Sequence, residues 1–167
     1  MTITVQVEPA ESSNWSVEYR WDRDTDILTA SAKAPVSGNG VSGSVELTGA
    51  DGSWLILDLA AGSIKGVEVA VWPDVRSVQT LGVPDDVQEG RLTVPATSTT
   101  GRVASFEVPT SLLAEADSAE RTIHFRVGGG KAHRTVRIAR DILIDVDAQN
   151  AIVGVWLLNV PPFPAEP

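Results

Sequence analysis

The chain has 167 residues and a formal net charge of −9, and 43% of its residues are hydrophobic. This length suffices for one domain that buries roughly 70% of its unfolded surface, so we expect a single domain over residues 1–167. The absence of cysteine excludes disulfides, thiolate chemistry and sulfur-ligated zinc. The negative charge disfavours binding to nucleic acid.

The N-terminal segment predicts neither secretion nor membrane insertion. Residues 1–9 alternate apolar and polar side chains, whereas a signal peptide has a basic segment followed by an apolar run. No apolar stretch approaches the ~20 residues that a membrane helix needs. We therefore expect a cytoplasmic protein without a membrane partner, and no motif indicates a cofactor.

Short runs rich in Val and other apolar residues predict strands through the first half of the chain. An acidic turn, DRDTD, joins the second and third strands, and a Gly/Ser-rich loop precedes the fourth. The predicted strands span residues 3–7, 15–21, 27–33 and 44–48, and a hairpin follows over residues 54–69.

The middle of the chain is less regular. Residues 74–81 fit either one helical turn or an edge strand, and residues 91–95 with 103–109 predict a hairpin around the turn ATSTTG. The stretch TSLLAEAD, residues 110–117, predicts the one short helix, because a Thr or Ser can cap it. Its residues Leu112, Leu113 and Ala116 would share one side.

Strands over residues 122–127 and 135–139 precede the clearest hairpin, ILIDVDAQNAIVGVWLLN, residues 142–159. Asn150 can take the left-handed conformation that closes its turn, and Asp147 can cap that turn. Alternation places one apolar set on the first face, namely Ile142, Ile144, Val146, Val153, Val155 and Leu157. The other face holds Leu143, Ile152, Trp156 and Leu158, so we expect cover on both sides.

The same pattern occurs upstream in WLILDLAAGSIKGVEV at a constant offset of 88 positions. Gly62 then matches Asn150, and Gly66 matches Gly154. We infer an internal duplication: unit one spans residues 15–72, a connector and hairpin 73–109, unit two 110–161 and an extended tail 162–167. The predicted fold is all-β, an antiparallel sandwich or partly open barrel of two pseudo-symmetric strand-rich repeats with one short helix.

The two units resemble the short bacterial and archaeal family known as domain of unknown function 2283. Its closing pattern, D-x-D-x-x-G-x-I-x-G-I-E, matches Asp145, Asp147, Ile152 and Gly154 of unit two, and its opening pattern, Y-D-x-x-x-D-x-L, matches WDRDTDIL of unit one. The resemblance implies a small all-β structure with no assigned activity. At the constant offset the two Asp residues of the closing pattern become leucines in unit one, which argues against a shared catalytic role.

Other carboxylates suggest sites that the spacing does not favour. Asp22, Asp24 and Asp26 have the spacing of the first calcium ligands of an EF-hand, but the required Gly and the bidentate Glu are absent, which favours a solvated turn. The second possibility is a paired-carboxylate site formed where the two hairpins meet. It would consist of Asp58, Asp145, Asp147 and Glu68.

Residues 121–140 contain six of the thirteen Lys and Arg residues and no Asp or Glu. If this segment folds back about its glycines, Phe125 faces Val136, Ile123 faces Ile138 and the basic residues share the polar face. The resulting candidate interaction surface comprises His124, Arg126, Lys131, His133, Arg134 and Arg137. We expect it to bind an acidic protein partner or a second copy of the chain.

The sequence therefore predicts a non-catalytic protein-binding or assembly module and no enzyme activity. The alternative is a small-ligand-binding β-barrel with a Trp-lined pocket, since the chain has five Trp residues. An interior apolar pocket of a few hundred Å³ would favour the ligand-binding alternative. An exposed apolar patch or an open sheet edge would favour the protein-binding module.

Overall fold

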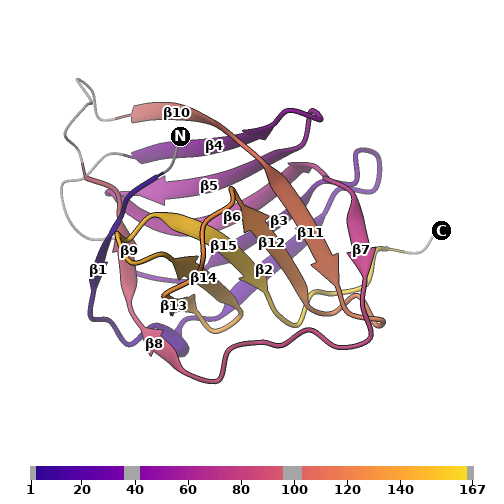
Figure 1. Ribbon diagram of the computed structural model, residues 1–167. Coiled ribbons are helices and arrows are strands. Elements are labelled where there is room, and N and C mark those ends of the chain that lie inside the picture. The colour runs from indigo at the N-terminus through magenta and orange to yellow at the C-terminus, as the bar shows by residue number, and fades with distance from the viewer. Residues whose placement is uncertain (1–2, 36–41, 96–102, 165–167) are drawn as a thin grey trace.

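The computed structural model describes residues 3–35, 42–95 and 103–164, and in this part of the chain the fold is all-β. Two sheets of eight and seven strands pack face to face, and the first curves into a half-barrel (Figure 1). The one helical element in the described residues is a 3-10 turn, η1, Ser12–Asn14. None of the described helical segments is long or apolar enough to cross a membrane.

The first sheet has the path β1-β9-β6-β5-β4-β10, with β3 also paired to β6 and β2 paired to β3. Its strands are β1 Gln6–Glu8, β2 Val17–Trp21, β3 Leu28–Ala32, β4 Ser42–Gly49, β5 Trp54–Ala60, β6 Ser63–Val71, β9 Arg91–Thr93 and β10 Val103–Thr110. The second sheet has the order β7-β11-β12-β15-β14-β13-β8. Its strands are β7 Val75–Ser77, β8 Val87–Glu89, β11 Leu112–Ala116, β12 Ile123–Val127, β13 Arg134–Ala139, β14 Ile142–Val146 and β15 Ile152–Leu157.

Both sheets contain the same six-strand arrangement, which is the structural expression of the predicted duplication. Strands β2-β3-β6-β5-β4 are joined antiparallel and β10 adds a parallel edge to β4. In the second sheet β11-β12-β15-β14-β13 are likewise antiparallel, and β8 adds a parallel edge to β13. The connector between the units thus supplies the edge strand β10 to the first sheet and both edge strands, β7 and β8, to the second.

The pairing within the two hairpins corrects the constant offset. Asp58 pairs with Gly66 in the first hairpin and Asp145 pairs with Gly154 in the second, and each pair is followed by a bulge. The first strands are therefore related by 87 positions and the second strands by 88. One additional residue in the second turn accounts for the difference, so the equivalent of Asp145 is Asp58 and not Leu57.

The same bulge corrects the predicted faces of the second hairpin. Val146 lies opposite Ile152, whereas the sequence analysis placed Val153 on that face. The turn itself is as predicted: Asn150 has a φ of 62°, and the Asp147 carboxylate accepts hydrogen bonds from the backbone N–H groups of Gln149 and Ala151 at 2.9 Å each. The hairpin is therefore closed by local chemistry.

The apolar faces of the two sheets meet in one core. Alternate residues of each strand point inward, and each such side chain contributes roughly 1.5–3 kcal/mol to folding when it leaves water. Residues from both units form this cluster, among them Leu28, Leu57, Val67, Phe125, Ile144 and Leu157. Leu143 and Trp156 are also buried but lie on the outer face of the second sheet, so the β14–β15 hairpin is covered on both sides as expected.

The predicted helix over residues 110–117 is wrong, because this segment forms strand β11. Leu112, Ala114 and Ala116 are buried, whereas Leu113 points outward and is 59% exposed. This period of two matches a strand that pairs with β12 and β7. Pairing in the sheet has outweighed the helix preference of Leu, Ala and Glu.

The hairpin predicted from residues 91–95 and 103–109 is also wrong. Strand β9 pairs with β1 and β6, whereas β10 runs parallel to β4. The turn ATSTTG that was expected to join them lies outside the described residues. Of the two alternatives for residues 74–81, the edge strand is correct, since β7 lies at the edge of the second sheet.

Candidate functional site

The outer face of the second sheet carries a buried polar cluster centred on Asp145. Its carboxylate accepts hydrogen bonds from the Thr135 hydroxyl at 2.6 Å and the Trp156 indole N–H at 3.0 Å, and His124 Nε2 lies 3.1 Å from the same carboxylate. The His124 ring stacks on Trp156 with a centroid separation of 3.9 Å. These four residues come from β14, β13, β15 and β12, so the cluster fastens four neighbouring strands.

Two opposing effects set the ionisation of Asp145. Burial disfavours the charged form, but the hydrogen bonds from His124, Thr135 and Trp156, together with the charge of His124, hold the pKa of Asp145 below its usual range. Gly154 lies directly across from this carboxylate, and a side chain there would collide with it. Position 154 therefore requires a glycine because the Asp145 carboxylate lies so close to it, and not because of the backbone conformation of residue 154.

The equivalent carboxylate in the first sheet, Asp58, has different neighbours. Glu68 occupies the place of Trp156, Thr29 that of His124 and Ser44 that of Thr135. No hydrogen bond to the Asp58 carboxylate occurs within the described residues. Burial raises the pKa of Asp58, and burial followed by the charge of Asp58 raises the pKa of Glu68. The first sheet thus holds a partly buried acidic pair that lacks a compensating donor among the described side chains.

The outer faces of the two sheets also differ in charge at other equivalent positions. Arg126 of β12 occupies the place that Ser31 has in β3, and Arg137 of β13 the place that Glu46 has in β4. From the first sheet to the second, both positions become more positive. Glu107 extends the acidic face on the adjacent strand β10.

The predicted basic hairpin is wrong in its pairing. Strands β12 and β13 do not pair, because β15 and β14 lie between them. Phe125 accordingly pairs with Ala114 and Val155, whereas Val136 pairs with Ile144. The prediction treated sequence neighbours as sheet neighbours.

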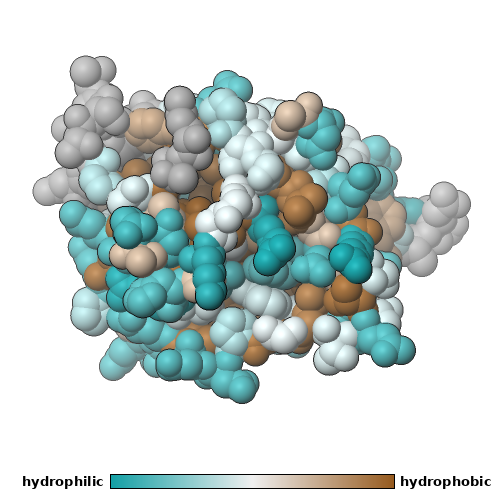
Figure 2. All heavy atoms as spheres, in the orientation of Figure 1, coloured by the Kyte–Doolittle hydropathy of each residue, from teal (hydrophilic) through white to brown (hydrophobic). Residues whose placement is uncertain are grey.

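The residues of the predicted interaction surface are therefore brought together only in part. His124, Arg126 and Arg137 lie on the outer face of the second sheet. The face of the molecule that Figure 2 shows has hydrophilic side chains interspersed with apolar areas. Arg134 lies at the end of this sheet, and its guanidinium donates to the Asn150 side chain at 2.8 Å. Lys131 and His133 are exposed between β12 and β13.

Acidic residues interrupt this basic surface. Glu115 pairs with His124, and Glu89 pairs with Arg137. Hydrogen bonds from Ser13 are the main cause of the lowered pKa of Glu89, and the charge of Arg137 adds to it. Arg126 is exposed, whereas Arg137 is half-buried and its guanidinium donates a hydrogen bond to the carbonyl of Arg140. The basic residues therefore do not form a continuous ribbon.

The structure places the residues of the two acidic sites considered above, the DRDTD turn and the paired carboxylates of the two hairpins. In the DRDTD turn, Asp22 accepts a hydrogen bond from the backbone N–H of Asp24 at 3.0 Å, and the described residues contain no group of carboxylates or histidines arranged to hold a metal ion. The paired-carboxylate site across the two hairpins is wrong, because Asp58 and Asp145 lie on the outer faces of opposite sheets. Thr135 and Trp156 were not predicted as partners of Asp145. The available signal was strand alternation, which places Asp145 and Trp156 on the same face of the hairpin.

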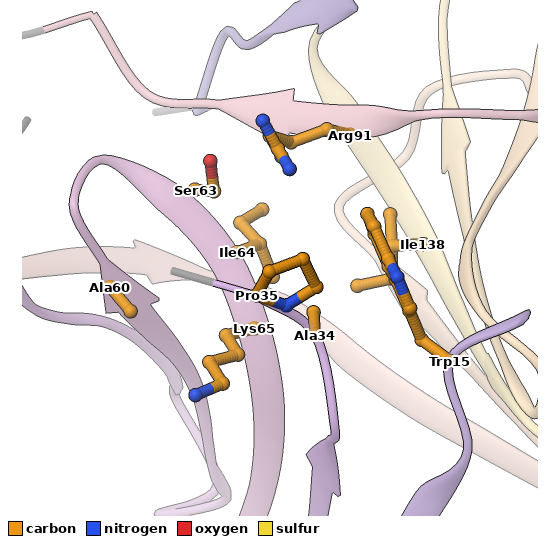
Figure 3. A pocket seen from close by; sticks show the side chains of 9 residues that line it. All are labelled: Trp15, Ala34, Pro35, Ala60, Ser63, Ile64, Lys65, Arg91 and Ile138. Atoms are coloured by element: carbon orange, nitrogen blue, oxygen red, sulfur yellow. The ribbon is translucent and has the colours of Figure 1, made fainter. Parts of the chain in front are cut away.

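The space between the sheets is closely filled near Trp15. The crevice there has a volume of about 20 Å³, and Figure 3 shows Trp15 and Ile138 on one side of it with Arg91 above. The Arg91 guanidinium lies 5.6 Å from the centroid of the Trp15 ring, which is the geometry of a cation–π contact. A larger apolar opening lies elsewhere, beside Trp21 and Trp72, and has a volume of about 480 Å³.

No protein-family model matches the chain, and a search of curated proteins likewise returned no match. The resemblance to the domain of unknown function 2283 accordingly stays a prediction.

Proposed function

We propose that the protein is a non-catalytic assembly module in which the outer face of the first sheet of one copy binds the outer face of the second sheet of the next copy. The observation that carries this proposal is a difference in charge at two pairs of equivalent positions, where Arg137 replaces Glu46 and Arg126 replaces Ser31 in the second sheet. Glu46 and Glu68 mark the first face, and Arg126 and Arg137 mark the second. Complementary charge of this kind selects partners and fixes their orientation.

The acidic pair Asp58 and Glu68 supports this contact. Both carboxylates are partly withdrawn from water, and burial raises the pKa of each, so their charged forms are disfavoured in the single copy. A guanidinium from a second copy would offset this penalty, because Arg presents several N–H donors in a plane that matches a carboxylate. Arg126 is exposed and available for that role.

The second face also contains an exposed apolar side chain next to its positive charge. Leu113 is 59% exposed and pairs with Arg126 across β11 and β12. On the first face Ile56 lies between Glu46 and Glu68 and is partly exposed. Each face therefore has an apolar residue next to charged ones, which matches the apolar centre and polar rim of a protein interface.

The arrangement of the two faces determines the kind of assembly. They lie on opposite sides of the sandwich (Figure 1). Each copy would therefore contact one neighbour through its first sheet and another neighbour through its second sheet. Such head-to-tail contacts give a ring where the rotation closes and a filament where it does not. The net charge of −9 opposes association at long range, so local pairing must stabilise the contact.

The test is sedimentation equilibrium at low and at high salt. We expect the wild-type mass to exceed that of one chain at low salt and to fall at high salt, because screening weakens exposed charge pairs. The double variant Arg126→Glu with Arg137→Glu should remain monomeric under both conditions. Arg23→Glu, in the turn between β2 and β3, is the control and should associate like the wild type. A wild-type protein that is monomeric at low salt and millimolar concentration would contradict the proposal.

A further inference from the structure

An open groove lies where β2 ends, β7 begins and the C-terminal segment leaves the second sheet (Figure 1). Its volume is about 480 Å³, which lies in the range of small-ligand sites. Trp21, Trp72, Val75 and Phe163 line it together with smaller apolar residues. Val75 and Phe163 are 45% and 46% exposed, so the apolar wall is open to solvent.

The aromatic side chains of the groove are held in fixed positions. Trp21 stacks on Trp72 with a centroid distance of 5.8 Å and an interplanar angle of 16°, and Phe163 meets Trp21 edge-on at 5.1 Å. The indole N–H of Trp21 donates to the carbonyl of Pro161 at 2.9 Å, and that of Trp72 donates to the carbonyl of Asp26 at 2.7 Å. Trp72 also contacts Phe125, with a centroid distance of 5.8 Å, so the most accessible ring of the groove is that of Phe163. Both indole donors are already used, so the aromatic wall offers ring surface and apolar edges to a ligand rather than a hydrogen bond.

The charge of the groove has one sign. Asp26 and Glu120 are the charged residues in its lining, and no Lys or Arg contributes to it. Both acidic residues have a positive φ, 61° and 56°, in the turns that carry them. Acidic residues in the lining and aromatic rings in the wall both attract a positive charge, and together they disfavour an anion.

We infer that this groove binds a small organic cation, an alkylated ammonium whose hydrocarbon groups lie against Trp21, Trp72 and Phe163 while Asp26 and Glu120 provide the opposite charge. Aromatic rings attract such cations through their negative faces, and alkylated ammonium groups lose little hydration when they are covered. The groove is distinct from the two outer faces, because its lining includes the buried, inward-facing residues Ala116 and Ile123. Binding in the groove does not depend on the proposed assembly.

The test uses choline and its neutral counterpart of the same shape, 3,3-dimethylbutan-1-ol. Each is titrated into the full chain while the indole N–H signals of the Trp residues are followed by NMR. We expect choline to shift the signals of Trp21 and Trp72, and to bind about tenfold more tightly than the neutral alcohol, since the added attraction is that of a positive charge over aromatic rings. Trp54 lies on β5 outside the groove, so its signal should not move.

Two variants locate the site. Glu120→Gln removes one negative charge from an exposed position, and Phe163→Ala removes one aromatic wall that is 46% exposed, so neither should prevent folding. We expect each to weaken choline binding severalfold, and Trp54→Phe to leave it unchanged. Equal affinity for choline and the alcohol, shifts that include Trp54, or no shift at any choline concentration would each overturn the inference.

Discussion

Asp58 and Asp145 occupy the same position in the two hairpins, each opposite a glycine and each next to a bulge, yet their pKa values are displaced in opposite directions. Burial raises the pKa of Asp58. For Asp145 burial is outweighed by three side-chain partners, which lower the pKa. The same framework therefore holds a hydrogen-bonded carboxylate, Asp145, in the second unit, and a partly buried carboxylate without a described hydrogen-bond donor, Asp58, in the first.

Removal of each carboxylate should have unequal effects on stability. Asp145→Ala leaves the Thr135 hydroxyl and the Trp156 indole without their buried acceptor, which should cost about 3 kcal/mol in the free energy of unfolding. Asp58→Ala removes a carboxylate that has no donor among the described residues and should change stability by less than about 1 kcal/mol. Urea unfolding of both variants measures this. Equal losses would contradict the different environments of the two residues.

The same contrast predicts opposite dependences on pH. Because the folded-state pKa of Asp145 is lowered, its contribution to stability is present above the ordinary pKa of 3.8 and is lost as pH falls through the folded-state value. The folded-state pKa of Asp58 is raised, so stability falls as pH rises from 3.8 to that raised value. The stability of Asp58→Asn relative to wild type should therefore increase with pH above 3.8, up to the raised value. The relative stability of Asp145→Asn should decrease as pH rises from the lowered folded-state value to 3.8. Thermal unfolding between about pH 2 and pH 6 would show both trends, and parallel curves would refute the assignment.

Substitution of the two hairpin glycines should destabilise the fold. A Cβ on Gly66 would lie 2.8 Å from the backbone carbonyl of Ala30, and one on Gly154 would lie 2.9 Å from His124 Nε2. Gly66→Val and Gly154→Val should each cost about 3 kcal/mol, because a bulky side chain cannot fit without displacing a strand or the Asp145 cluster. Gly82→Ala is the control, since nothing lies within 4 Å of its Cβ. An unchanged melting temperature for both Val variants would show that these contacts are not close.

Loss of the turn cap should have a smaller effect. Asp147→Ala removes the acceptor of two backbone N–H groups and should cost about 1 kcal/mol. Gln149→Ala, at an exposed position of the same turn, should be neutral. Chemical denaturation distinguishes the two. A loss for Gln149→Ala as large as that for Asp147→Ala would mean that the turn is not held by the carboxylate.

Local chemistry explains which parts of the fold could be predicted from the sequence. The two hairpins were found because their turn signals, Gly62 and Asn150, lie within the segments they join. The strand β11 was missed because Leu, Ala and Glu favour a helix locally, and its strand character depends on pairing with β12. Strands β12 and β13 are likewise separated in the sheet by β14 and β15, which follow them in the chain. The order of strands along the chain does not reveal such an arrangement.

The candidate site shows the same limit. The equivalence of Asp58 and Asp145 was hidden by one additional residue in the second turn, although the similar surroundings Leu-Asp-Leu and Ile-Asp-Val were a usable signal. The partners of Asp145 come from three other strands, and their convergence follows from sheet order. The charge difference between the outer faces became visible only when these registers were known.

The proposed assembly is tested most directly by mixing two variants that each lack one face. Arg126→Ala with Arg137→Ala removes the basic face and keeps the acidic one, and Glu46→Ala with Glu68→Ala does the reverse. Neutral substitutions are needed here, because reversed charges would create a second complementary pair of faces. Each variant alone should sediment as a monomer at low salt, and an equimolar mixture should form a dimer with one copy of each, because only one intact face of each kind remains. A mixture that stays monomeric, while the wild type associates, would contradict the head-to-tail contact between the two outer faces.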